Sequence, residues 1–225
     1  MPRSAARLIA ALGLLAAIMG SARAFEAPAW SGSYVGRLQV LALMQSLNAE
    51  LLSRDSATAT LELWCAAHRL AAPARIVADR VGGAEEPASD EIRALLQVSA
   101  QEPVVYRRVR LRCGAHVLSE ADNWYVPSLL TPEMNRQLTE TDAPFGRVVR
   151  PLDFRRRTLA ARLMWSPLPE GWEMAAAPPA SAPLALPPFL IEHRAVLTLP
   201  DGRAFSALVE SYTSAALAFP APAVP

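Results

Sequence analysis

The chain has 225 residues, of which 52% are hydrophobic, so its composition supports a packed core and excludes a wholly disordered protein. Its 22 basic residues are all arginines and stand against 21 acidic residues, which gives a net charge of +1. This balance excludes the strongly positive footprint on which nucleic-acid binding depends, and we expect no nucleic-acid partner.

The first 24 residues have the pattern of a cleavable export signal. Two arginines precede the uncharged apolar run 8–19, and the small-x-small sequence 22–24 predicts cleavage after Ala24. The run is shorter than the ~20 apolar residues that cross a bilayer. We therefore expect a periplasmic or secreted protein without stable membrane insertion after cleavage; an uncleaved anchor or a wrongly chosen start codon is the alternative. Removing residues 1–24, which hold three arginines and no acid, leaves 19 arginines against 21 acids, a net charge of −2.

Two helices are predicted at the start of the mature chain. Apolar residues recur at helical spacing over residues 35–52, and residues 57–70 form a second helix-like segment. Between them, Asp55-Ser56 interrupts the pattern and offers a side chain suited to an N-cap.

The next region is predicted less sharply. Residues 74–81 and 95–98 are short strand-like apolar runs, separated by a turn at 82–87. Residues 90–96 are compatible with a helical turn instead.

The segment 104–113 alternates as a strand does, with one mostly apolar face and one arginine-rich face. The first face carries Val105, Arg107, Val109, Leu111 and Cys113, and the second carries Tyr106, Arg108, Arg110 and Arg112. Residues 117–125 follow a turn and are the expected antiparallel partner, which Pro127 ends.

The second half continues with a helix that starts at Thr131-Pro132 and ends near residue 140, then a turn at 144–147. The basic cluster 155–157 is expected on an exposed helix or loop face.

The Ala/Pro-rich stretch 174–188 is expected to be an extended loop. Segments 191–199 and 203–213 flank a Pro-Asp-Gly turn and form the clearest hairpin. Residues 220–225 are expected to be a frayed tail. Paired strands with a few helices predict one α+β domain over residues 25–219.

Four short pieces of this sequence together resemble the chorismate lyase (chorismate–pyruvate lyase) family. In chain order they are Tyr106–Leu111, Leu118–Pro127, Ala143–Arg147 and Leu208–Glu210. The resemblance extends from about residue 48 to residue 218 and is strongest over 104–147 and again over 194–212. It implies a central antiparallel sheet with helices packed on one side and flap-like helices or loops over an internal pocket.

The resemblance also implies the site. It places Arg108 and Glu210 as catalytic residues that bind substrate, and it adds Phe145, Ala57 and Asn123 as further substrate-binding positions. An arginine can hold a carboxylate through two parallel charge-assisted hydrogen bonds, and chorismate carries two carboxylates. The implied reaction releases pyruvate from chorismate and leaves 4-hydroxybenzoate, with no cofactor. We expect no metal site, since no Cys/His cluster is present, and we expect a monomer.

Other interpretations remain open. The same scaffold could be a non-catalytic periplasmic binder of a small aromatic or carboxylate ligand, or a structural protein that has lost the pocket. Arg108 and Glu210 could form only a structural ion pair, and Asp122-Asn123 could be a turn instead of a pocket rim. The chain departs from the enzyme at Ala57, where the family has a pocket Met, and export would separate it from cytoplasmic chorismate.

The only cysteines are Cys65 and Cys113. In an oxidising compartment two thiols in one chain favour a disulfide, and two buried free thiols are the alternative.

Overall fold

The computed structural model describes residues 29–83 and 85–222, so the predicted signal segment 1–24 lies outside the described residues. Its helices and strands, in chain order, are β1 (Trp30–Gly32), α1 (Tyr34–Leu52), α2 (Ala57–Ala67), β2 (Ile76–Arg80), α3 (Asp90–Leu96), β3 (Val105–Cys113), β4 (His116–Tyr125), α4 (Pro132–Glu140), α5 (Phe145–Val148), β5 (Arg155–Leu163), β6 (Ser181–Leu184), β7 (Phe189–Thr198) and β8 (Ala204–Thr213). Within this described part, no helix is long and apolar enough to cross a membrane.

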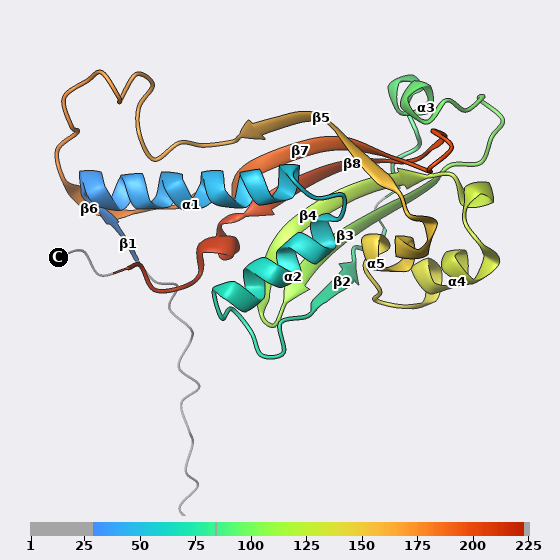
Figure 1. Cartoon of the computed structure of the whole chain (residues 1–225), viewed down its shortest axis with the longest axis horizontal. Coiled ribbons are helices and arrows are strands. Elements are labelled where there is room, and N and C mark those ends of the chain that lie inside the picture. The colour runs from blue at the N-terminus through green and yellow to red at the C-terminus, as the bar shows by residue number, and fades with distance from the viewer. Residues whose placement is uncertain (1–28, 84, 223–225) are drawn as a thin grey trace, which may run out of the picture.

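A six-stranded sheet organises the domain. Its strand order is β2-β3-β4-β8-β7-β5, and every neighbouring pair is antiparallel. β1 and β6 form a separate two-stranded sheet near the start of α1. In Figure 1, α1 and α2 lie along one side of the large sheet, which we call its inner face. These features confirm the predicted α+β class with a central antiparallel sheet and helices packed on one side, from which α3 departs.

α1 shows why this layer forms. Its buried side chains Val40, Met44, Leu47 and Leu51 recur every three or four residues and so share one stripe. That stripe packs on the inner face against β7 and β8, where Ile191 and Tyr212 are fully buried. The Ser33 side chain caps the helix by accepting a hydrogen bond from the Gly36 N–H at 3.1 Å.

Two smaller clusters complete the core. α4, α5 and the segment around Phe154 cover the remaining end of the inner face. α3 packs instead on the opposite, outer face, where Ile92 and Leu96 meet Trp124 and Val196. The rest of the outer face carries the charged side chains of β3 and β4.

Three expectations about secondary structure, drawn from the sequence, are wrong. Residues 95–98 are not a strand, because α3 continues to Leu96 and buries Ile92 and Leu96 one helical turn apart. The basic segment 155–157 is not a helix or loop, because it begins the edge strand β5. The Pro-rich stretch 174–188 contains the strand β6, which pairs with β1. The structure gives no helix or strand to 220–222, and 223–225 lie outside the described residues.

Candidate functional site

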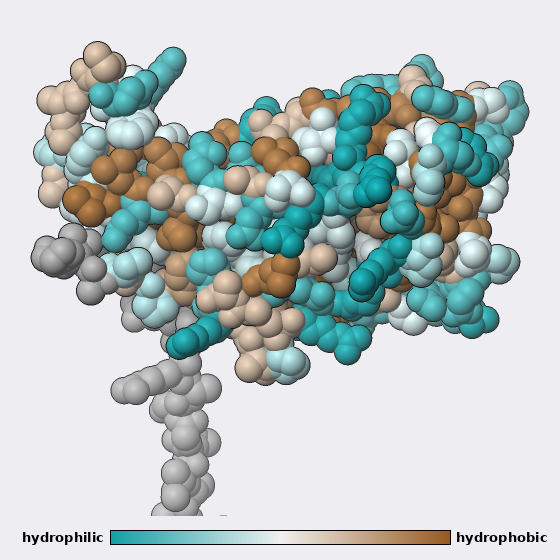
Figure 2. Space-filling view, viewed as in Figure 1, coloured by the Kyte–Doolittle hydropathy of each residue, from teal (hydrophilic) through white to brown (hydrophobic). Residues whose placement is uncertain are grey.

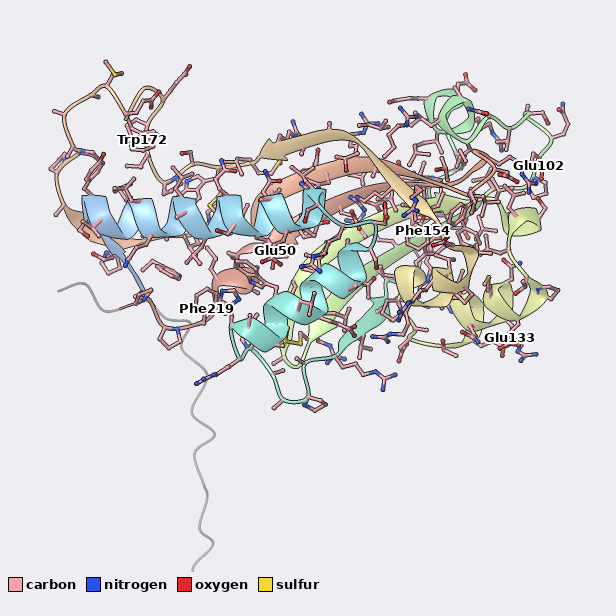
Figure 3. The ribbon with its side chains drawn as sticks, in the orientation of Figure 1. Glu50, Glu102, Glu133, Phe154, Trp172 and Phe219 are labelled. Carbon is pink, nitrogen blue, oxygen red and sulfur yellow. A yellow bond between two sulfur atoms is a disulfide. The ribbon has the colours of Figure 1, made fainter. Side chains whose placement is uncertain are left out.

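A small cavity lies between the inner face of the sheet and its helical cover. Its volume is about 50 Å³. The apolar part of its lining is Ala57, Val109, Leu111, Ala121, Phe145, Phe154, Leu197 and Leu208, and the polar part includes Arg107, Asn123, Arg156 and Glu210. Phe154 is labelled in Figure 3, just before β5 and close to α5. We call this space the inner cavity.

Arg107 is a buried cation without a carboxylate partner. It is on β3, its residue is 7% exposed, and its Nη2 donates a hydrogen bond to the Ala143 carbonyl at 3.1 Å. Among the described residues, no Asp or Glu forms an ion pair with it, and its Nε has no acceptor. Burial lowers the pKa of the guanidinium to about 10. A buried charge of this kind is costly unless another group compensates it.

Glu210 lies in the same cavity and is already neutralised. Its Oε2 accepts hydrogen bonds from Arg156 Nη2 at 2.6 Å and from the Tyr212 hydroxyl at 3.0 Å. The side chains of Arg156 and Glu210 are 4% and 7% exposed, so the pair is sealed from solvent. Among the described residues, no hydrogen bond reaches Glu210 Oε1, so this oxygen is left as an acceptor.

Three donors that belong to the cavity lining have no partner. They are Arg107 Nε, Asn123 Nδ2 and Arg156 Nε, from β3, β4 and β5 respectively. The Asn123 amide is oriented by the Ser206 hydroxyl, which donates to its Oδ1 at 2.6 Å. Buried donors are almost always satisfied in folded proteins, so three orphans around one cavity indicate a site for an acceptor-rich group.

The strand register sets the spacing between Arg107 and Glu210. Arg107 pairs with Asn123 and Asn123 pairs with Leu208, so two strand spacings separate Arg107 from β8, about 10 Å across the sheet. Glu210 is the next inward-facing residue of β8 after Leu208. The cation and the carboxylate therefore occupy different ends of the inner cavity.

Of the residues predicted for the site, Ala57, Phe145, Asn123 and Glu210 line the inner cavity. Arg108 does not, and its expected position in the pocket is wrong. A strand alternates its side chains, so Arg108 lies on the outer face when Arg107 lies on the inner one.

Arg108 has an ordinary outer-face environment. Its side chain is 40% exposed and lies 3.7 Å from both Glu120 and Asp122. The charge of Asp122 raises the pKa of Arg108, whereas burial lowers that of Arg107. Asp122 is also on the outer face, where the Tyr106 hydroxyl donates to it at 2.5 Å.

Sequence reasoning missed Arg107 and Arg156 as site residues. The alternation of β3 carries a usable signal for Arg107, because it places this residue among apolar neighbours. Arg156 has no comparable signal, because it is the middle residue of a run of three arginines.

A second, larger space adjoins the first. This outer cavity has a volume of about 400 Å³ and shares Asp55, Ser56, Thr58, Gly146 and Phe154 with the inner cavity. In Figure 2, hydrophilic residues are prominent on this face over the region where α2, α5 and β5 meet.

The wall between the cavities is tightly packed and held by polar contacts. A Cβ at Gly146 would lie 3.0 Å from Ser56 Oγ and 3.1 Å from Thr58 Oγ1, so glycine lets α5 approach the start of α2 closely. Arg147 of α5 forms an ion pair with Glu62 of α2. The Arg156 N–H donates to Asp55 Oδ1 at 2.7 Å, which fixes the start of β5 to the same place.

Cys65 and Cys113 form a disulfide, which decides between the two open alternatives. The bond joins α2, whose first turn lines the cavity, to β3, which carries Arg107. Among the described residues, no group of three or more His, Cys, Asp and Glu side chains could hold a metal ion.

Comparison with known proteins places the chain in a family. No family model matches it. It is 59% identical over 196 residues to the uncharacterized protein y4mC of Sinorhizobium fredii (strain NBRC 101917 / NGR234), covering 86% of this chain and 83% of that protein. The chain belongs to the y4mC family.

Solved structures of regulators are more distant from this member of the y4mC family. The effector domain of PhnF from Mycobacterium smegmatis aligns with a TM-score of 0.45 at 14% identity, over 71% of this chain and 89% of that one. A transcriptional regulator of the GntR family from Bacillus cereus aligns with a TM-score of 0.38 at 12% identity, over 67% and 98%. These values are too low to carry any argument about the function of this chain.

Proposed function

We propose that this protein binds a small carboxylate ligand in the inner cavity, with Arg107 as the group that receives the carboxylate. The observation that carries the proposal is the buried guanidinium of Arg107, which has no carboxylate partner and an unused Nε. A bound carboxylate would compensate this charge through charge-assisted hydrogen bonds. The unpaired Asn123 Nδ2 offers a further donor to the same ligand.

The apolar lining supports an aromatic or otherwise apolar body for this ligand. An apolar cavity that holds one benzene ring has a volume of ~150 Å³. The inner cavity, at about 50 Å³, is smaller, so an aromatic acid would extend across the shared wall into the outer cavity or displace part of the cover. Phe145 lines the inner cavity and Phe154 lines both cavities, so both would contact the ring.

A second candidate is the lyase reaction that releases pyruvate from chorismate and leaves 4-hydroxybenzoate. The observation that favours it is that a cationic and an anionic side chain, Arg107 and Glu210, line the same cavity. Extended into the outer cavity, this site could hold chorismate in a reactive pose, since the elimination needs positioning more than covalent help. Arg107 would take the role that the sequence comparison assigned to Arg108.

We further propose that the protein acts outside the cytoplasm. The support is the signal-like sequence of residues 1–24 together with the disulfide between Cys65 and Cys113, since disulfides persist chiefly in oxidising compartments. Thiol alkylation of the protein in its native host would find both cysteines blocked if this is correct.

The binding proposal is tested by calorimetry with benzoate and 4-hydroxybenzoate on the purified protein. Arg107→Gln should weaken binding at least ~10-fold, because a hydrogen bond to a charged group contributes ~1.5–3 kcal/mol. Arg108→Gln is the matched control on the opposite face and should leave the affinity within about twofold. The neutral amide 4-hydroxybenzamide should bind weakly to all three proteins.

Loss of fold does not explain the expected result, because Arg107→Gln removes an uncompensated buried charge and should unfold no more easily than the parent. An equal loss of affinity in Arg107→Gln and Arg108→Gln, or no binding of any of these acids, would refute the proposal. Incubation with chorismate completes the test: formation of 4-hydroxybenzoate and pyruvate that is abolished by Arg107→Gln alone would assign the lyase reaction.

A further inference from the structure

The charges that line the inner cavity do not cancel. Arg107 and Arg156 are both buried cations, and Glu210 is the buried anion. Asp55 also borders the cavity, but its side chain is 41% exposed and lies 3.4 Å from the exposed Arg155, so this rim pair adds no net charge. The buried lining therefore carries one positive charge in excess.

The neighbouring titratable groups leave this sum unchanged at neutral pH. Tyr212 stays protonated, because burial raises the pKa of its hydroxyl. His193 is fully buried opposite Glu210 in the β7–β8 register, and its Nε2 meets Asn48 Oδ1 at 2.8 Å. Burial lowers the pKa of this imidazole, so it stays neutral. Arg80 and Asp142 act on Arg107 in opposite directions and do not line the cavity.

The two ends of the inner cavity offer different chemistry to a ligand. At the Arg107 end, a cation with an unused donor faces the ligand. At the Glu210 end, the charge of Arg156 is already balanced by the carboxylate, although its Nε donates to no group, and the free Glu210 Oε1 can only accept a hydrogen bond. A second anionic group placed at this end would meet the Glu210 carboxylate and find no cation whose charge is still uncompensated.

From this arrangement we infer that the inner cavity selects monoanions, namely acids with one carboxylate at the Arg107 end and a neutral hydrogen-bond donor at the Glu210 end, and that it rejects dicarboxylates. The inference rests on the proposed carboxylate binding and names its ligand class. Because chorismate carries two carboxylates, the inference and the lyase candidate exclude each other. A contact between like charges in this mostly buried site is strongly unfavourable, whereas a hydroxyl or amide N–H donating to Glu210 Oε1 is favourable.

A pair of probes with the same shape tests the charge rule. Terephthalate carries carboxylates at both ends of a benzene ring, and 4-carbamoylbenzoate replaces one of them by an amide of nearly equal size. Calorimetry on the full purified protein should find 4-carbamoylbenzoate bound at least ~10-fold more tightly than terephthalate. Because the two molecules differ by one charge and not in size, a steric limit of the cavity cannot produce this difference.

Two variants change the charge sum in opposite ways. Glu210→Gln raises the excess to two positive charges, so the affinity for terephthalate should rise at least ~10-fold relative to the affinity for 4-carbamoylbenzoate. Glu210→Gln combined with Arg156→Met returns the excess to one and should restore the preference for 4-carbamoylbenzoate. The double variant also replaces the buried ion pair as a unit, which proteins tolerate better than loss of one partner, so it provides the comparison if Glu210→Gln alone does not fold.

The outcomes separate this inference from the proposed function. Tighter binding of 4-carbamoylbenzoate, reversed by Glu210→Gln or retained in the double variant, supports the charge rule. Terephthalate binding as tightly as 4-carbamoylbenzoate to the parent protein would overturn the inference and leave carboxylate binding intact. If neither acid nor benzoate binds, the proposed function fails and this inference fails with it.

Discussion

Three pairs of adjacent residues show how differently this sheet uses its buried and its exposed side chains. On β3, Arg107 is buried without an ion-pair partner, whereas Arg108 is half-exposed between two acids. On β5, the Arg156 side chain is buried against Glu210, whereas that of Arg155 is 71% exposed and borders the outer cavity. On β3 the pleat makes the difference, because each step along a strand changes the face and with it the access to water. An arginine can therefore be given a functional role only after its face is known.

The third pair, Arg112 and Cys113, extends the contrast to covalent and ionic links. Cys113 points inward and is bonded to Cys65 of α2. Arg112 points outward and holds Asp79 of β2 through two hydrogen bonds at 2.8 and 3.1 Å. The inner link crosses between layers, and the outer one only bridges neighbouring strands at the surface.

The largest effect on stability is expected at β5. Arg156→Ala should lower the free energy of unfolding by ~3–5 kcal/mol, because it leaves Glu210 buried without its partner. Arg155→Ala should change it by less than ~1 kcal/mol, since exposed ion pairs contribute little. Urea denaturation of both variants measures the difference. Similar losses of unfolding free energy in the two variants would contradict the contrast between the buried and the exposed arginine.

Loss of the disulfide should have the second-largest effect on stability. Replacing both cysteines by alanine should lower the free energy of unfolding by ~2–4 kcal/mol, as expected for a bond that closes a long loop. Arg112→Gln, one residue away on the outer face, should leave the free energy of unfolding nearly unchanged, because the Asp79 pair is solvent-screened. Thermal unfolding with and without a reductant gives a second measurement, in which only the parent and Arg112→Gln should respond to reduction.

The smallest effect concerns pH. Burial holds the pKa of His193 below its ordinary value of 6.5, so below pH 6.5 the unfolded chain takes up a proton more readily than the folded one. This contribution to stability is complete above pH 6.5 and is lost as the pH falls below it. His193→Gln should show a shallower decline between pH 7 and pH 5 in denaturation experiments. Parallel pH profiles of variant and parent would show that the inner face has no such sensitivity.

Much of the architecture could be predicted from the sequence, because its signals are local. The helical spacing of 35–52, the alternation of β3 and the Pro-Asp-Gly turn before β8 all act over a few residues, and the structure confirms each. The sequence does not predict β6, because the prolines in and around this segment suggest a loop. The segment still forms a strand because it pairs only with the short β1, where the missing N–H donor of a proline is tolerated.

The site was predictable only in part. Alternation along β3 places Arg107 among apolar residues, but the resemblance to chorismate lyase selects its neighbour Arg108, which does not line the cavity. In a strand, a shift of one residue moves a side chain to the other face. The contact of Arg156 with Glu210 spans 54 residues and depends on how β5 joins the sheet, which no short-range pattern reveals.

The contacts between the two cavities have a consequence for rates. Gly146 brings α5 against α2, and the contacts Arg147–Glu62 and Arg156 N–H to Asp55 tie α2, α5 and β5 together between the cavities. A ligand that lies behind these contacts would leave when they open, so the cover as well as the Arg107 contact would set the dissociation rate. High salt, which screens the half-exposed Arg147–Glu62 pair, would then shorten the residence time more than it weakens the affinity.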